Sequence, residues 1–220
     1  MQISEALVSR KSCFLDDEGW RQIQSAESNS ALMPKNSALY HEGLNYFATV
    51  PGLLQKANAL DPEIDPERAM IIRLAADQLR TDMMAWYARV GVVSKRSLQS
   101  TKSDDNWSVL PVEYVYDDSI TASFAVNYSA YLILINNLLD ELAGSASHSE
   151  ENKALATEIS LSASYCSKIG FCGTQAMSLA LPVALIALPQ KDLVGVRKWI
   201  DFFKQSNQST KLWATILEKK

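Results

Sequence analysis

Few side chains of a reactive type stand inside the apolar segments of this sequence. The polar groups that we expect to face an interior cavity are Tyr128, Tyr131, Tyr165 and Cys166. Hydroxyl and thiol groups at such positions are candidates for lining an interior pocket that holds a small apolar ligand. We favour the alternative that they are core residues, because a buried tyrosine commonly satisfies its hydroxyl by a hydrogen bond within the protein. The four residues are the predicted pocket lining, and none is assigned a catalytic role.

Carboxylates and imidazoles, which supply general acids, bases and metal ligands, are sparse and scattered. The helical segments hold four carboxylates that we interpret as parts of solvated helix faces: Asp77, Asp82, Asp140 and Glu158. The two histidines, His41 and His148, stand far apart in segments typical of a surface. Since the sequence has no Gly-rich phosphate loop, H-E-x-x-H, EF-hand loop or G-x-S-x-G, we predict no catalytic, cofactor-binding or metal-binding residues.

Cysteine usage and charge narrow the class of protein. Cys13, Cys166 and Cys172 make an odd count without a C-x-x-C pair, so neither a zinc site nor a disulfide framework is expected. Free thiols of this kind are typical of a reducing compartment. The N-terminal stretch lacks the apolar run of a secretory signal, so we expect an intracellular chain. The net charge of −4 argues against binding of this chain by itself to the phosphate backbone of a nucleic acid.

The composition is that of a folded domain. The 220 residues are 47% hydrophobic and 21% charged, which suits a globular protein with a substantial core. Eight glycines and seven prolines are few for an all-β protein rich in turns. With no internal repeat and no long low-complexity linker, we predict a single domain over residues 1–220.

Helical periodicity predicts an all-α fold, an irregular bundle of about eight helices. The clearest helix begins after Asp65, a capping residue, and ends near Gly91. Its apolar residues recur at intervals of four, three, four, three and four: Ile72, Ala76, Leu79, Met83, Trp86 and Val90. The spacing also suits an intermolecular coiled coil, but it covers less than four heptads, so we favour a seam inside the bundle.

Two further helices, near 120–143 and 174–188, are expected to be central and buried. No charged residue lies between Asp118 and Asp140, or from Ile169 to Gln190. Such segments are either buried helices or membrane spans. We favour burial, and expect no membrane association, because polar residues, glycines or a proline interrupt both segments. Three asparagines of the first helix could hydrogen-bond inside a bundle or line a ligand pocket: Asn127, Asn136 and Asn137.

The segment ahead of the second central helix predicts another helix. Ser147 and Glu150 have capping-box spacing at its start. One face of that helix runs from Leu155 to Cys166. Gly170 and Gly173 then interrupt the pattern, and the second central helix is expected to begin at Thr174 and to kink at Pro182.

Shorter elements complete the expected bundle. A helix over 3–9 is followed by a short one capped by Asp16. The helix from Ser37 should end at Val50, because a residue before proline avoids the helical region, and a new helix should start at Pro51. We expect 92–118 to hold an extended aromatic connector rather than a short strand. Helices near 192–203 and 212–217 end the chain.

Four short motifs follow one another late in the chain. They are an S-x-x-Y-C element at Ser162 to Cys166, a turn with Gly170 and Gly173, a proline element at Leu181 to Ala184, and a W-x-x-F/W-F element at Trp199 to Phe203. In their order and spacing they resemble the last third of the regulatory domain that follows the zinc binuclear cluster in fungal transcription factors. In that family the first motif lies on a helix that leads through a glycine-containing turn to the helices of the other two.

Earlier segments are similar to the same family. Its F-L-x-x-x-x-W-x-x-I/V element, with a preceding basic pair, is matched by Arg10, Lys11, Phe14, Leu15, Trp20 and Ile23. A V-P-x-L-L element is matched by Val50 to Leu54. The family's usual proline-tryptophan pair is replaced by Gln24 and Ser25, and its six-cysteine zinc cluster is missing. The chain looks like the C-terminal part of the helical domain.

The resemblance implies a transcription-regulator-like helical domain in the nucleus. It implies a regulatory, ligand-sensing or dimerisation role, with a small hydrophobic ligand, a protein partner or a second copy as partner and no direct contact with nucleic acid. The alternative is a helical enzyme or binding protein that acts on a small hydrophobic metabolite in fungal secondary metabolism. Without the resemblance, the expected location is the cytoplasm.

Overall fold

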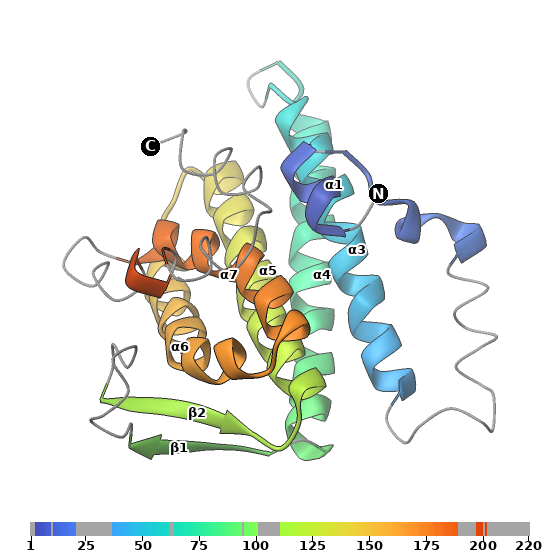
Figure 1. The fold of residues 1–220 in the computed structure, drawn as a ribbon. Helices are drawn as coiled ribbons and strands as arrows, with labels where there is room; N and C mark the ends of the chain where they lie inside the picture. Colours follow the sequence, from blue (N-terminus) through green and yellow to red (C-terminus); the bar gives the residue numbers. More distant parts are fainter. Residues whose placement is uncertain are drawn as a thin grey trace. The chain divides into compact units, whose positions relative to one another are not determined.

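The fold is mostly helical, which confirms the predicted class. The computed structural model describes residues 3–9, 11–20, 37–61, 64–93, 95–100, 111–188, 197–199 and 201. These described residues are 80% helical, in eight helices, with one two-stranded sheet (Figure 1). The chain divides into two compact units, Met1–Val93 with Ile135–Ala146, and Ser94–Leu134 with Ser147–Lys220. One domain over residues 1–220 stays a prediction.

The first unit is organised along α3 (Ser37–Asn58) and α4 (Pro66–Val93), which pack against each other. The short elements α1 (Ile3–Ser9) and η1 (Phe14–Asp16) pack on α3. Their contact buries the small side chains of Ala6, Cys13 and Ala48. The N-terminal segment is therefore docked on α3 by close packing of small residues.

Helix α4 begins and packs as its sequence predicts. The Asp65 carboxylate accepts a hydrogen bond from the backbone N–H of Arg68 at 3.0 Å, as a helix cap does. All six residues of the predicted apolar stripe, from Ile72 to Val90, are buried. The helix runs past Gly91 to Val93, two residues beyond the predicted end.

A tryptophan of α4 anchors that helix to α3. The Trp86 side chain is fully buried, and its indole N–H donates to the Leu39 carbonyl at 2.7 Å. Phe47 meets the indole edge-on, with ring centroids 5.6 Å apart. A Cβ atom on Gly43 would lie 2.2 Å from Cζ2 of Trp86, so glycine is the residue that lets the indole approach the α3 backbone.

The predicted break at Pro51 is wrong, because α3 continues through it from Ser37 to Asn58. Proline in a helix removes one backbone donor and crowds the preceding turn, at a cost of about 3 kcal/mol. Val50, Pro51 and Leu53 are all buried at this point. Burial of apolar surface around the proline offsets the local cost, and this tertiary term is not visible in the local sequence.

The second unit contains the two-stranded sheet, and here the predicted connector is corrected. Strands β1 (Arg96–Ser100) and β2 (Val112–Tyr116) pair antiparallel, with Arg96 opposite Tyr116 and Ser100 opposite Val112. Strand β2 packs on α6 (Ser149–Lys168). The alternation of 112–116 was visible in the sequence, but the partner strand stands before it in a segment without aromatic residues. The expected extended connector is therefore wrong, and 112–116 forms the short strand that was the other alternative.

Helix α5 (Ser119–Ala143) forms where it was predicted. Asp118 caps it, since its carboxylate accepts from the backbone N–H of Thr121 at 2.8 Å. Gly144 follows with φ 59°, a left-handed conformation that favours glycine. Among the described helices, α5 is long and apolar enough to cross a membrane, and 72% of its most apolar stretch is buried. The core helix of a soluble protein meets the same criterion.

Helices α6 and α7 (Phe171–Ala187) pack on each other. The turn between them holds Gly170 at φ 68°. Gly173 does not interrupt α7, and α7 begins at Phe171 rather than at Thr174. A Cβ atom on Gly173 would lie 2.0 Å from the Cys166 carbonyl oxygen, so this glycine permits the close approach of the two helices.

Two predicted helix starts are corrected. Helix α6 has His148 as its N-terminal capping residue and no side-chain capping bond, so the Ser147–Glu150 capping box is wrong. Near the N-terminus it is Asp17, rather than Asp16, whose carboxylate accepts from the backbone N–H of Gly19 at 2.9 Å. The helices predicted near 192–203 and 212–217 lie mostly outside the described residues, where only 197–199 and 201 are placed.

Candidate functional site

The four predicted pocket residues lie on α5 and α6. Tyr128 and Tyr131 are buried on α5, and Cys166 is buried on α6. Burial raises the pKa of the Cys166 thiol to about 12, so the thiol stays neutral and a poor nucleophile at physiological pH. These three side chains behave as core residues. Their role in holding a ligand stays a prediction.

Tyr165, the fourth of these residues, is half-buried and faces the sheet. Its ring lies 5.3 Å, between centroids, from the ring of Tyr116 on β2. Burial raises the pKa of the Tyr165 phenol, and the negative charge of Asp118 acts in the same direction. The phenol therefore remains protonated, and its ring helps to seat β2 on α6.

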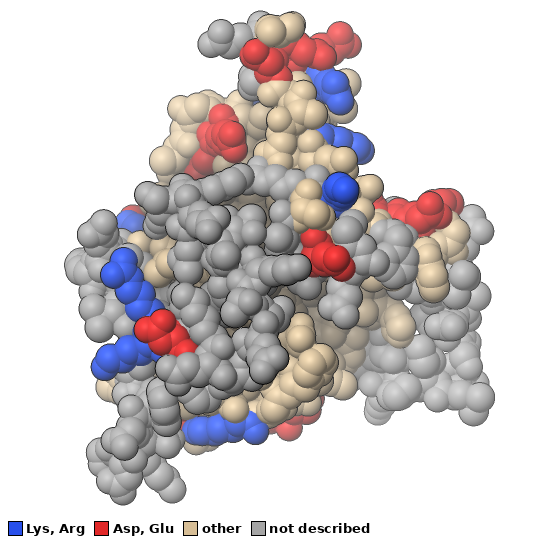
Figure 2. Space-filling model, turned by 45° about the horizontal axis from the view of Figure 1, so that its top comes forward, with Lys and Arg blue, Asp and Glu red and all other residues tan. Residues whose placement is uncertain are grey.

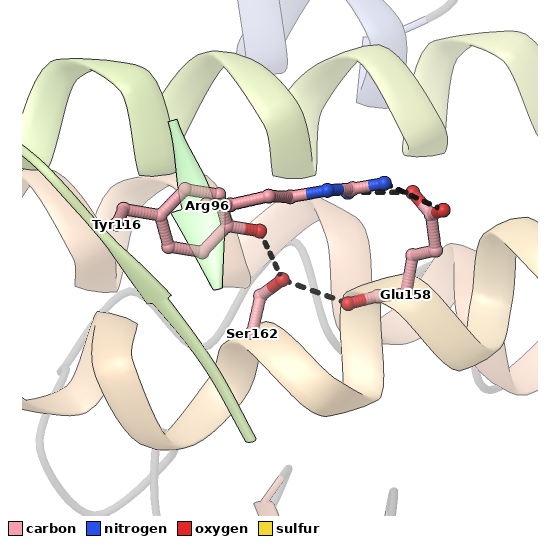
Figure 3. A network of polar contacts seen from close by, with 4 residues as sticks. All are labelled: Arg96, Tyr116, Glu158 and Ser162. Carbon is pink, nitrogen blue, oxygen red and sulfur yellow. Dashed lines mark hydrogen bonds and ion pairs between the residues drawn. The ribbon is translucent and has the colours of Figure 1, made fainter. Parts of the chain in front are cut away.

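A polar network joins the sheet to α6, and Figure 3 shows its four side chains. The Arg96 guanidinium from β1 reaches Glu158 on α6 with two parallel hydrogen bonds of 3.0 Å each. The same guanidinium lies 4.5 Å over the ring centre of Tyr114. Paired bonds of this kind fix the plane of the guanidinium as well as its position. The pair therefore sets how β1 lies against α6.

The second part of the network is a chain of hydroxyl groups. The Tyr116 and Ser162 hydroxyl oxygens are 2.6 Å apart, and Ser162 donates to the Glu158 carbonyl oxygen at 2.7 Å (Figure 3). Since a serine hydroxyl has one proton, Tyr116 must be the donor to Ser162. The buried Ser162 hydroxyl thus donates to a backbone carbonyl and accepts a hydrogen bond from the Tyr116 hydroxyl. The arrangement holds β2 in place rather than activating a nucleophile.

Sequence reasoning missed Glu158 as a member of this network. We expected a solvated helix face, but the carboxylate pairs with a residue 62 positions away. No local signal in the sequence joins Arg96 to Glu158. A second contact, between Lys168 and Glu113 at 3.5 Å, ties the other end of β2 to α6.

Polar contacts of the first unit also serve to join elements. The Arg80 guanidinium donates to the Asn136 amide oxygen at 2.8 Å, so α4 is tied to the last part of α5. This contact confirms the interpretation that Asn136 hydrogen-bonds inside a bundle. The Glu42 carboxylate accepts from Tyr46 at 3.0 Å and pairs with Arg89. Burial and the bond to Glu42 raise the pKa of Tyr46 to about 12.

The remaining candidates for chemistry are separate from one another. His41 is half-buried rather than on the surface, and its Nδ1 atom and Oδ1 of Asn45, one turn along α3, are buried without a hydrogen-bond partner among the described residues. Asp82 accepts from Gln78 at 2.9 Å on α4. Among the residues that the structure describes, no three histidine, cysteine or acidic side chains group as metal ligands would.

On the face drawn in Figure 2, the described charged side chains form no extended region of one sign. There, the described lysine and arginine side chains stand in small groups, with aspartate and glutamate side chains among them. A nucleic-acid interface usually shows a continuous basic patch or stripe. The described part of this face therefore lacks that electrostatic pattern.

An apolar group lies exposed on α4. Met70, Ile71 and Leu74 are 59%, 60% and 58% exposed. Arg73 and Asp77 flank them and are exposed as well. Sequence reasoning assigned the apolar residues of this helix to one buried stripe and overlooked this second group.

No protein-family model, curated protein or solved structure matches this chain. The resemblance to the regulatory domain of fungal zinc-cluster transcription factors therefore depends on the motifs of the sequence. In the structure, Ser162 and Cys166 of one motif are buried on α6, and Trp199 of another is buried. The phenylalanines of that last motif lie outside the described residues.

Proposed function

We propose that this chain is a transcription-regulator-like helical domain that acts by binding another protein chain and does not bind DNA by itself. The observation that carries the proposal is the exposed apolar group on α4. Exposed apolar residues are ordinary when they stand singly, whereas a contiguous group on one helix face is typical of an interaction surface.

The polar interior supports the same proposal. The buried or half-buried polar side chains with the strongest contacts join secondary-structure elements: Arg96 with Glu158, Tyr116 with Ser162, and Arg80 with Asn136. Catalytic groups, by contrast, are usually brought together around a space that the substrate can enter. A protein that acts through its outer surface does not need these polar side chains for chemistry, so they can all serve to join secondary-structure elements.

Gene deletion followed by complementation tests the proposal. Deleting the gene in the organism that makes the chain should change the abundance of a defined set of transcripts. Restoring the full chain should reverse that change. A Leu74→Glu variant should fail to restore them, because a charge would stand in the apolar group. Leu98→Glu, at a residue 55% exposed on β1, is the matched control and should restore them.

Two outcomes would contradict the proposal. One is an unchanged transcript profile together with the loss of a hydrophobic metabolite, which would favour the enzyme. The other is a purified chain that binds duplex DNA at physiological salt, measured by fluorescence anisotropy.

A further inference from the structure

The outward face of α4, defined by Met70, Ile71, Leu74, Arg73 and Asp77, points away from α3. The stripe that packs inward runs from Ile72 to Val90 and is buried. At about 100° per residue, Met70 and Leu74 lie within about 20° of the direction opposite to that stripe. Ile71 lies on one flank of this face. Helix α4 therefore has an inward apolar stripe and an outward apolar group.

Arg73 and Asp77 lie together on the other flank. They stand one helical turn apart, about 80° and 40° from the centre of the face. Both residues are exposed, and neither side chain has an ion-pair or hydrogen-bond partner among the residues that the structure describes. The outward face thus presents an apolar centre beside one positive and one negative charge.

This charge pattern is complementary to itself. In an antiparallel pair of α4 helices, a two-fold axis at the level of Ala75 along the helix relates positions that are equally far from that residue in the sequence. Arg73 and Asp77 are each two residues from Ala75, and a two-fold axis brings matching flanks together. Arg73 of each copy then meets Asp77 of the other, and the ion pair forms twice. Leu74 lies close to the axis and packs against Leu74 of the second copy.

We propose that the outward face of α4 is the isologous interface of an antiparallel homodimer, in which Arg73 of each copy pairs with Asp77 of the other. The proposal names the partner of the surface on which the proposed function rests. Its test measures the oligomeric state alone. A monomer that still restores transcripts would overturn the dimer without overturning the regulatory role.

Charge reversal of the full-length chain tests both the interface and its direction. Arg73→Asp places two acidic side chains opposite each other twice, and Asp77→Arg does the same with two basic side chains. Each variant should raise the dimer dissociation constant on the order of tenfold or more, because facing like charges repel. The double variant Arg73→Asp/Asp77→Arg restores opposite charges and should recover the dimer. Sedimentation velocity over a concentration series gives the constants.

Mixing the two single variants is the sharper experiment. One variant carries two acidic residues and the other two basic residues, so the mixed pair has both ion pairs restored. With one partner isotope-labelled, native mass spectrometry should show the heterodimer in excess over both homodimers. Arg68→Asp, on another exposed side of α4, is the matched control and should leave the dimer unchanged. Circular dichroism of each variant verifies that its helices have formed.

Three results would overturn the proposal. The first is a wild-type chain that stays monomeric at concentrations of about 100 μM, the weak end of specific association. The second is a dimer that none of the charge variants weakens. The third is a weakened dimer that neither the double variant nor the mixture recovers, because the two charges would then not face each other.

Discussion

The contact between α3 and α4 and the contact between the sheet and α6 are built from different kinds of side chain. The first depends on one large indole that enters a gap above Gly43 and makes one hydrogen bond to backbone. The second depends on a guanidinium, a carboxylate and two hydroxyls that satisfy one another. Shape decides the first contact and hydrogen-bond pairing decides the second. In both contacts the side chains serve to hold elements together, whereas the outward face of α4 has no such role among the described residues.

The largest effect should come from the apolar contact. Trp86→Ala leaves a cavity and removes the bond to Leu39, and should lower the free energy of unfolding by about 3–5 kcal/mol. Urea denaturation followed by circular dichroism measures the change. A loss below about 1 kcal/mol would mean that the indole does not anchor α4 to α3.

A smaller loss should follow when the hydroxyl chain is broken. Ser162→Ala removes the oxygen that accepts from Tyr116 and should cost about 1–3 kcal/mol. Tyr116→Phe removes the donor at the same bond. If the two hydroxyls act as a unit, the double variant should cost less than the sum of the single variants in a double-mutant cycle. Strict additivity would show that the two groups do not bond.

The buried thiol gives a comparison that depends on pH. The pKa of Cys166 is about 12 in the folded chain, and burial is the cause. The folded state therefore holds this proton to a higher pH than the unfolded state. The stability that the protonated Cys166 thiol contributes is fully present below the ordinary thiol pKa, and it is lost as the pH rises toward 12. A Cys166→Ala variant should show a shallower loss of stability between pH 9 and pH 11 than the wild type. Equal slopes would contradict this.

Alkylation separates the same thiol from an exposed one. Cys172 is exposed and Cys166 is buried. At pH 8, iodoacetamide should modify Cys172 in the folded chain and Cys166 only after denaturation, as read by peptide mass spectrometry. Modification of Cys166 at the rate of Cys172 would mean that the core around α6 opens readily.

The smallest effect should come from the ion pair of the sheet. Both partners are about one-third exposed, at 33% for Arg96 and 30% for Glu158. Pairs with such access to solvent contribute about 0–1 kcal/mol, and salt weakens them. Arg96→Met keeps most of the apolar stem and should cost less than about 1 kcal/mol, with a smaller difference from wild type in high salt. A larger cost that is independent of salt would show that packing over Tyr114 dominates.

Local rules of the sequence predicted some of this structure. The cap at Asp65 and the buried stripe of α4 follow from residue type and helical period, which act within a few residues. The continuation of α3 through Pro51 depends on burial, and the pairing of β1 with β2 depends on a strand elsewhere in the chain. The pair formed by Arg96 and Glu158 joins distant segments. All three depend on contacts that local sequence rules do not specify.

The candidate surface was less predictable than the fold. Tyr128, Tyr131 and Cys166 were named for their chemistry, and the structure buries them in its core. Met70, Ile71 and Leu74 were overlooked because an apolar residue in a helix is first assigned to the core. Only knowledge of which face of α4 meets α3 separates the outward group from the inward stripe.

The proposal that this chain works through the outward face of α4, rather than through an interior pocket, is tested most directly by native mass spectrometry of the full chain purified from a fungal host. We predict a dimer whose mass equals twice that of the polypeptide, and a monomer with the mass of the single variant polypeptide for Leu74→Glu. A monomeric wild-type chain that retains a small molecule would contradict the account. It would favour a ligand pocket lined by Tyr128, Tyr131, Tyr165 and Cys166 instead.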